Sequence, residues 1–270
     1  TNIIRATDIR TTRPSELHQT RLPLVLGVVA TVVCDAALTL IVRDGLSRLS
    51  DPHGRLLLGL VLGQISTLAI WVATGRTNIG FSAAAMFAAA GLLSWPLAKV
   101  MKPDIAECFA FLCAMGLATA LPLLVLRASG LSWSATGGGG LRRSWQFSLA
   151  GLVGVMTTSA FLLTAWRFME IPLWAAAEIC GYALGFSGIA WFALFIASLP
   201  AVWWASAAVV ATVGLGAGAG LSALFGQQQI DMRTTADAGF VHAIYVFMSV
   251  LVVRYAGGRL GWTSRGKDEE

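Results

Sequence analysis

The sequence has little charge: Asp, Glu, Lys and Arg make up only 12% of its 270 residues, while 56% are hydrophobic. An ordinary soluble domain carries roughly 25% charged residues. This shortage of charge excludes a soluble globular protein. Because no loop between the apolar runs is long enough to form a soluble domain, any function must lie in the apolar segments, at their ends or in the short tails.

Eight long apolar runs are present instead, each close to the roughly 20 residues that a helix needs to cross a bilayer. None alternates between polar and apolar residues, which excludes a barrel of strands and leaves helices. The predicted fold class is therefore all-α, a polytopic transmembrane bundle of about eight spans. These spans are Leu22 to Val42, Leu56 to Thr74, Ile79 to Leu97, Ile105 to Leu126, Gln146 to Trp166, Leu173 to Ala197, Ala201 to Phe225 and Ala236 to Tyr255.

The eight spans fall into two halves of four. Between them lies a segment with four consecutive glycines, which predicts a flexible linker rather than a helix. Aligning the two halves reveals only generic apolar similarity, so the sequence gives no support to an inverted-repeat transporter. The predicted organisation is a tail at 1–21, a first half at 22–126, the linker at 127–145, a second half at 146–255 and a tail at 256–270.

The positive charges predict an orientation. With eight spans, both tails lie on the same side of the membrane as the linker, and this side carries more Lys and Arg residues than the other. The positive-inside rule therefore places both termini in the cytoplasm of a bacterial inner membrane, although Arg43, Arg48 and Arg55 lie on the opposite side. The net charge of +5 sits beside the spans, where topology and anionic headgroups explain it, so no nucleic-acid partner is predicted.

Two segments carry a resemblance to a known family. They are "GQISTLAIWVATG" at Gly63 to Gly75 and "RRSWQFSLAGLVGVMTTSAFLLTAW" at Arg142 to Trp166. Both are similar to elements of an uncharacterised multi-pass membrane protein family of planctomycete-type bacteria, in which a basic stretch leads into Phe-Ser-Leu, leucines, Thr-Thr and alanine-rich sequence. The resemblance covers about forty residues. It implies a polytopic inner-membrane protein of unknown activity, with no catalytic residues to transfer.

Polar residues inside the spans are candidate functional groups, because ionisable side chains are costly in a membrane. Asp35 is the deepest acid, and Gln64 on the next span is a possible hydrogen-bond partner; a proton or ion site is the alternative. Glu107 lies near the start of its span, where a helix N-terminus favours negative charge. Glu178 and His242 enter from the same face at similar depth. They either share a proton or are solvated separately.

Asp237 has a different interpretation. It follows Thr234 by three residues at the start of the last predicted span. Thr234 as N-cap and Asp237 three positions later resemble a capping box, which satisfies the free N–H groups of a helix start.

The sequence Gly185-Phe186-Ser187-Gly188 resembles the Gly-x-Ser-Gly of rhomboid intramembrane serine proteases, in which the serine is paired with a histidine two helices later. The resemblance implies a catalytic pair of Ser187 and His242. The span at 105–126, however, lacks the histidine and asparagine that rhomboids place two helices before the serine. The residues around His242 also lack the small-residue pattern of that family.

The same stretch has a second interpretation as a packing surface. Glycines four residues apart let two transmembrane backbones approach closely. The sixth and seventh spans both carry this spacing, so they are predicted to pack on each other through Gly181, Gly185, Gly188, Gly214 and Gly218.

No metal or cofactor is predicted. The four cysteines lie inside apolar runs without a Cys-x-x-Cys arrangement and are interpreted as small core residues. The three histidines are scattered over a tail, a loop and a span. These residues are Cys34, Cys108, Cys113, Cys180, His18, His53 and His242.

The predicted function is that of a structural or assembly subunit in the inner membrane, without recognisable catalytic machinery. Its expected partners are the lipid bilayer and other membrane proteins or a second copy of the chain. The alternatives are a small-solute or proton-coupled carrier that uses the buried acids, and a rhomboid-like intramembrane serine protease.

Overall fold

A computed structural model describes residues 52–74, 79–101, 104–128, 131–135, 173–199, 202–225, 231–255 and 258–262. The predicted spans at 22–42 and 146–166 lie outside the described residues, as does Asp35. Six helices in the described part are long and apolar enough to cross a membrane, which is compatible with an integral membrane protein. They are α2 (Pro52–Thr74), α3 (Ile79–Met101), α4 (Ile105–Ala128), α6 (Leu173–Ser198), α7 (Trp203–Phe225) and α8 (Met232–Tyr255).

These helices coincide with six of the predicted spans, but two of them begin a turn earlier. Helix α2 begins at Pro52 rather than Leu56, and α8 begins at Met232 rather than Ala236. At the start of α8, the backbone N–H groups of Thr234 and Thr235 donate to the carbonyl of Asp231. The charged residues in these extra turns therefore belong to the helices, although hydropathy alone assigns them to loops.

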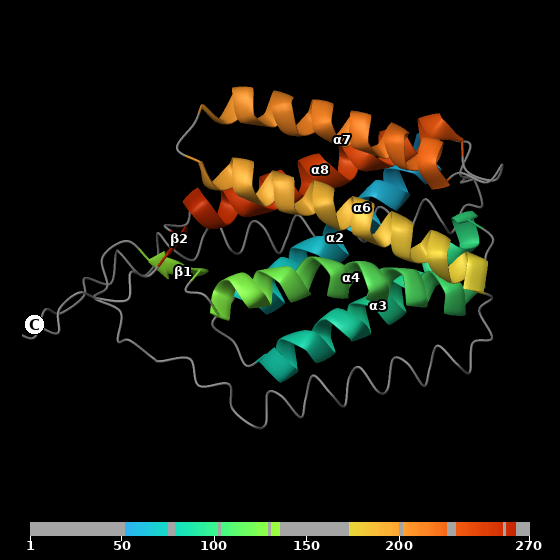
Figure 1. Cartoon of the computed structure of the whole chain (residues 1–270), viewed down its shortest axis with the longest axis horizontal. Helices are drawn as coiled ribbons and strands as arrows, with labels where there is room; N and C mark the ends of the chain where they lie inside the picture. The colour runs from blue at the N-terminus through green and yellow to red at the C-terminus, as the bar shows by residue number, and fades with distance from the viewer. Residues whose placement is uncertain are drawn as a thin grey trace, which may run out of the picture.

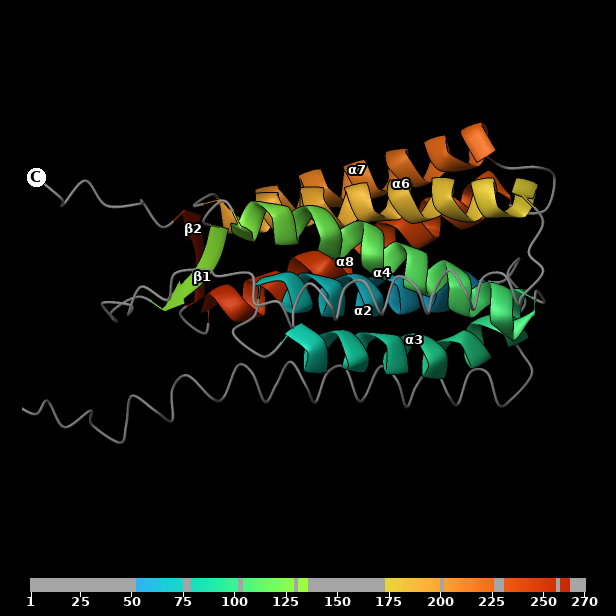
Figure 2. The ribbon, with the colours of Figure 1, turned by 60° about the horizontal axis from the view of Figure 1, so that its bottom comes forward.

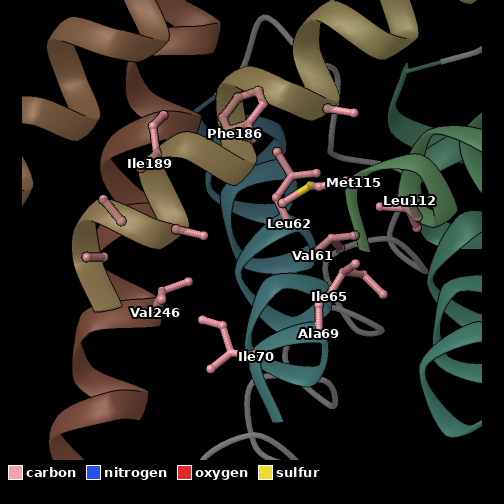
Figure 3. Packing of buried hydrophobic residues seen from close by; sticks show 14 of the residues in the cluster. Val61, Leu62, Ile65, Ala69, Ile70, Leu112, Met115, Phe186, Ile189 and Val246 are labelled. Carbon is pink, nitrogen blue, oxygen red and sulfur yellow. The ribbon is translucent and has the colours of Figure 1, made fainter. Parts of the chain in front are cut away.

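The helices form a bundle in which α2 is central (Figures 1 and 2). Helix α2 packs against α3, α4 and α8, and it is buried over more of its length than any other described helix. Figure 3 shows Leu62 of α2 beside Met115 of α4, with Phe186 of α6 on the other side of Leu62. This arrangement explains why α2 has an apolar surface all round: it meets protein, rather than lipid, on most sides.

Helices α2, α4, α6 and α8 run in one direction, and α3 and α7 run in the other. The clearest evidence is the contact between α2 and α8, where Gly59 touches Val241 and Gly63 touches Tyr245. A Cβ on Gly59 would lie 2.6 Å from the Cβ of Val241, so these two backbones are at closest approach. This contact uses a Gly-x-x-x-Gly spacing that was not among the predicted packing surfaces.

Helix α7 also packs through glycines, but its partner differs from the predicted one. A Cβ on Gly214 would lie 2.6 Å from the carbonyl oxygen of Gly239 on α8, and Gly218 meets the backbone of Thr235 on the same helix. The predicted contact of α6 with α7 does exist: the side chains of Phe225 and Leu221 on α7 pack against Gly181 and Gly185 of α6. Gly214 and Gly218 of α7, however, contact α8 rather than α6. Gly239 of α8 has no side chain, so the two backbones can meet directly.

Gly188 is not part of any such contact. It is exposed, and a Cβ at this position would have no neighbour within 4 Å. The prediction that it belongs to the packing surface of α6 is therefore wrong.

One end of the bundle carries a short ribbon of two antiparallel strands, β1 (Leu131–Ala135) and β2 (Gly258–Trp262), with Trp133 opposite Leu260. The predictions for these two places were a flexible linker and a tail. At the same end, Arg127 of α4 donates to the carbonyl of Ala73 at 2.8 Å, and Arg254 of α8 donates to the carbonyl of Ala197 at 3.0 Å. Arginines thus satisfy the free carbonyls at the ends of neighbouring parallel helices.

Candidate functional site

Ser187 lies in a buried polar cluster between α4 and α6. Its side chain is only 1% exposed, and its hydroxyl lies 3.0 Å from the hydroxyl of Thr119 on α4. The Ser187 hydroxyl also reaches the carbonyl of Ala183 at 2.7 Å, and the Thr119 hydroxyl reaches that of Met115 at 2.9 Å. Each hydroxyl therefore has acceptors in its own helix and a link to the other helix.

A third polar side chain joins the same two helices. The indole N–H of Trp191 on α6 donates to the carbonyl oxygen of Thr119 at 3.0 Å. Together with the two hydroxyls, the indole holds α4 and α6 together in the interior of the bundle.

This placement separates the two residues of the suggested catalytic pair. The partners of Ser187 come from α4 and from its own helix, and the His242 ring lies against Phe186, with ring centroids 5.5 Å apart. Neither ring nitrogen of His242 has a hydrogen-bond partner within the described part of the chain. The geometry that would activate Ser187 through His242 is therefore not formed in this structure.

Replacing Ser187 with alanine should weaken the contact between α4 and α6 by about 1 kcal/mol, since interhelical hydrogen bonds in membranes contribute about 0.6 kcal/mol on average and at most about 1.7. The matched control is Ser198→Ala, because among the described residues that hydroxyl bonds to the carbonyl of Phe195 in its own helix and to no other helix. Unfolding of the purified protein in mixed detergent micelles would measure both. Equal losses in the two variants would contradict the interhelical role of Ser187.

Glu178 and His242 do not meet. The earlier start of α8 places His242 ten residues into its helix, whereas Glu178 lies five residues after the start of α6. At 1.5 Å per residue, this difference puts His242 more than one turn deeper than Glu178. Phe186 occupies the position on α6 that faces the imidazole, and Glu178 is half-buried further toward the helix start.

An ion pair that was not predicted from the sequence links α2 to α8. Arg55 donates to the carboxylate of Asp237 at 2.7 Å, and the two side chains are 11% and 42% exposed. The capping-box interpretation of Asp237 is wrong, because α8 begins five residues earlier and Thr234 lies buried within the helix. The missed signal was that Arg55 and Asp237 each lie about one turn into a helix that begins at the same end of the bundle.

The remaining candidates are Glu107, Gln64 and Asp35. Glu107 occupies the first turn of α4, where its charge suits the helix N-terminus, as predicted. Gln64 is buried on α2, and its suggested partner Asp35 lies outside the described residues.

Two of the cysteines match their predicted role as core residues. Cys108 and Cys113 are free thiols buried in α4, but Cys180 is exposed on α6, contrary to prediction, and Cys34 lies outside the described residues. In the part of the chain that the structure describes, no three His, Cys, Asp or Glu side chains come together in a group that could hold a metal ion.

Comparison with known proteins gives no relative. No family model, no curated protein and no solved structure matches the chain. The resemblance to the uncharacterised planctomycete-type family stays a prediction.

Proposed function

We propose that this chain is a structural or assembly subunit of a bacterial inner membrane. The observation that carries the proposal is that several buried polar side chains of the described helices join one helix to another. The hydroxyl of Ser187 joins α6 to α4, and the carboxylate of Asp237 joins α8 to α2. Side chains bonded across helices in this way contribute to holding the helices together.

The close glycine contacts support the same role. Helix α8 is in near-backbone contact with α2 at Gly59 and with α7 at Gly239. A carrier that alternates between two states needs helices that can slide or rock against each other. Close contacts of this kind along α2, α7 and α8 favour a rigid unit that presents fixed surfaces to a partner.

The orientation belongs to this proposal as well. Arg127 and Arg254 lie at the end of the bundle that also carries the β1–β2 ribbon. The positive-inside rule favours this end as the cytoplasmic one. The partner in the assembly is proposed to be another membrane protein or a second copy of the chain, in contact through the lipid-facing surface.

Native mass spectrometry of the protein extracted in mild detergent tests the proposal. We expect a species heavier than the 28.5 kDa chain by the mass of at least one further polypeptide. Extraction in a harsh detergent is the control and should release the single chain. A single chain with no copurifying protein under the mildest conditions would contradict an assembly role.

The protease alternative has its own test. A fluorophosphonate probe labels a serine that an adjacent base activates. Because the hydroxyl of Ser187 is buried and bonded to α4, we expect no labelling of the purified protein. Labelling that disappears in Ser187→Ala would instead establish a nucleophilic serine and overturn the proposed function.

A further inference from the structure

The end of the bundle that carries the β1–β2 ribbon has no acidic residue in the part of the chain that the structure describes. The ribbon end carries arginines instead, among them Arg127 of α4 and Arg254 of α8. Its charge therefore favours a negatively charged ligand. The acidic residues among the described ones lie near the starts of α4, α6 and α8, at the opposite end of the bundle: Asp104, Glu107, Glu178, Asp231 and Asp237.

Arg254 is fixed in place at the ribbon end by the last residues of α6. Its Nη1 atom donates to the carbonyl of Ala197 at 3.0 Å and also to the carbonyl of Leu199. Both bonds use one of the three nitrogen atoms of the guanidinium, which leaves N–H donors for a further acceptor. Since carbonyls do not neutralise the guanidinium, a held and positively charged group stands at this edge of the bundle.

Two exposed tryptophans begin α7 at nearly the same level. The side chains of Trp203 and Trp204 are 55% and 63% exposed. Gly214 of α7 lies beside Gly239 of α8, and the two helices run in opposite directions. Counted back from this contact, Trp203 lies about one turn away from Arg254 along the bundle axis.

The chain between α6 and α7 places these side chains on one edge of the bundle. Leu199 accepts the bond from Arg254, and Val202 directly precedes Trp203; both apolar side chains are at least half exposed. Three residues of chain span at most about 11 Å, so Val202 must lie close to the guanidinium of Arg254. We call this surface the α6–α7 rim, which consists of Leu199, Val202, Trp203, Trp204 and Arg254.

From this combination we propose that the α6–α7 rim binds the headgroup of an anionic phospholipid. The planar guanidinium of Arg254 matches the oxygens of a phosphate group. The indole rings suit the headgroup level, where one side of a tryptophan meets hydrocarbon and the other meets polar groups. Because no carboxylate of the described residues lies at this end, a lipid with a net negative charge binds better than a zwitterionic one.

This site goes beyond the proposed assembly role and does not depend on it, because a lipid can bind to a single chain as well as to a complex. The failure of one proposal therefore leaves the other standing. Lipid retained per chain reports on the rim, whereas the mass of copurifying polypeptides reports on the assembly.

Native mass spectrometry of the full chain tests the site, with equal amounts of phosphatidylglycerol and phosphatidylcholine of the same acyl chains added to the detergent. The unmodified protein should retain more phosphatidylglycerol. Arg254→Gln removes the charge and keeps an N–H donor, so the ratio of the two retained lipids should fall roughly fivefold. The matched control is Arg233→Gln, an exposed arginine in the first turn of α8 at the opposite end, which should keep the ratio. An unchanged ratio in Arg254→Gln would overturn the proposal.

The double variant Trp203→Leu/Trp204→Leu tests the rim through exposed side chains, and it keeps their apolar character. The lipid retained per chain should fall severalfold, because leucine has no polar edge for the headgroup level. Retention equal to that of the unmodified protein would sink the proposal, even if Arg254→Gln does not fold. Loss of a copurifying polypeptide from Arg254→Gln, without any lipid preference in the unmodified protein, would assign the rim to a protein partner and overturn it as well.

Discussion

Replacing Gly214 with leucine should prevent α7 from packing on α8 and should leave the purified protein largely unfolded. A Cβ at this position would lie 2.6 Å from the carbonyl oxygen of Gly239 and 2.7 Å from the Cβ of Ala243. A backbone oxygen cannot move aside as a flexible side chain can, so the helices must separate. Overpacking of a core typically costs about 1–3 kcal/mol, and we expect Gly214→Leu to exceed this range.

The chain provides a matched control two residues away. Gly216 lies on the same helix and is exposed, and a Cβ at this position would have no neighbour within 4 Å. Gly216→Leu adds the same atoms without a clash and should match or slightly exceed the stability of the unmodified protein, since leucine is about 1 kcal/mol better than glycine in a helix interior. Unfolding by increasing amounts of a denaturing detergent measures both variants. Similar stability of the two variants would contradict the contact between α7 and α8.

The six described spans were predictable because their signal is local. A run of apolar residues determines a transmembrane helix by itself, whatever its neighbours are. Helix α8 shows the limit of this signal: its first turn contains Arg233 and Thr234, so hydropathy placed the start of the helix a turn too late. That error moved the predicted position of His242 toward the membrane surface and suggested the contact with Glu178, which the structure does not contain.

Helix partners were not predictable from glycine spacing. The spacing of Gly214 and Gly218 indicates that some backbone comes close, but it does not say which one. The decisive residue is Gly239, a single glycine on α8 without a second glycine four residues away. Its role as the contact point for α7 can be recognised only from the structure, in which α7 lies against it.

The polar links between helices were hidden for a related reason. Thr119 and Ser187 are 68 positions apart, and Arg55 and Asp237 are 182 apart. These separations in the sequence do not predict which side chains lie close together in the folded bundle. Serine and threonine are also common in membrane helices, where most of them bond to their own backbone, so neither Thr119 nor Ser187 stands out before the helices are placed.

Replacing Asp237 with alanine should destabilise the first turns of α2 and α8, because it leaves the buried guanidinium of Arg55 without its carboxylate. Removing one partner of a buried ion pair costs about 3–5 kcal/mol. The side chain of Asp237 is 42% exposed, so solvent screens part of the interaction, and we expect a loss of about 2 kcal/mol.

A second substitution identifies the origin of this loss. In Arg55→Met/Asp237→Ala no buried charge is left, and the apolar methionine still packs against α8, so most of the lost stability should return. Arg233→Met is the matched control, because Arg233 is an exposed arginine in the first turn of α8 and its loss should change stability by less than about 0.5 kcal/mol. The variants are compared with the unmodified protein by detergent-induced unfolding. If the double variant is as unstable as the sum of its two single variants, the carboxylate of Asp237 and the guanidinium of Arg55 do not act as a pair, and another interaction must hold the starts of α2 and α8 together.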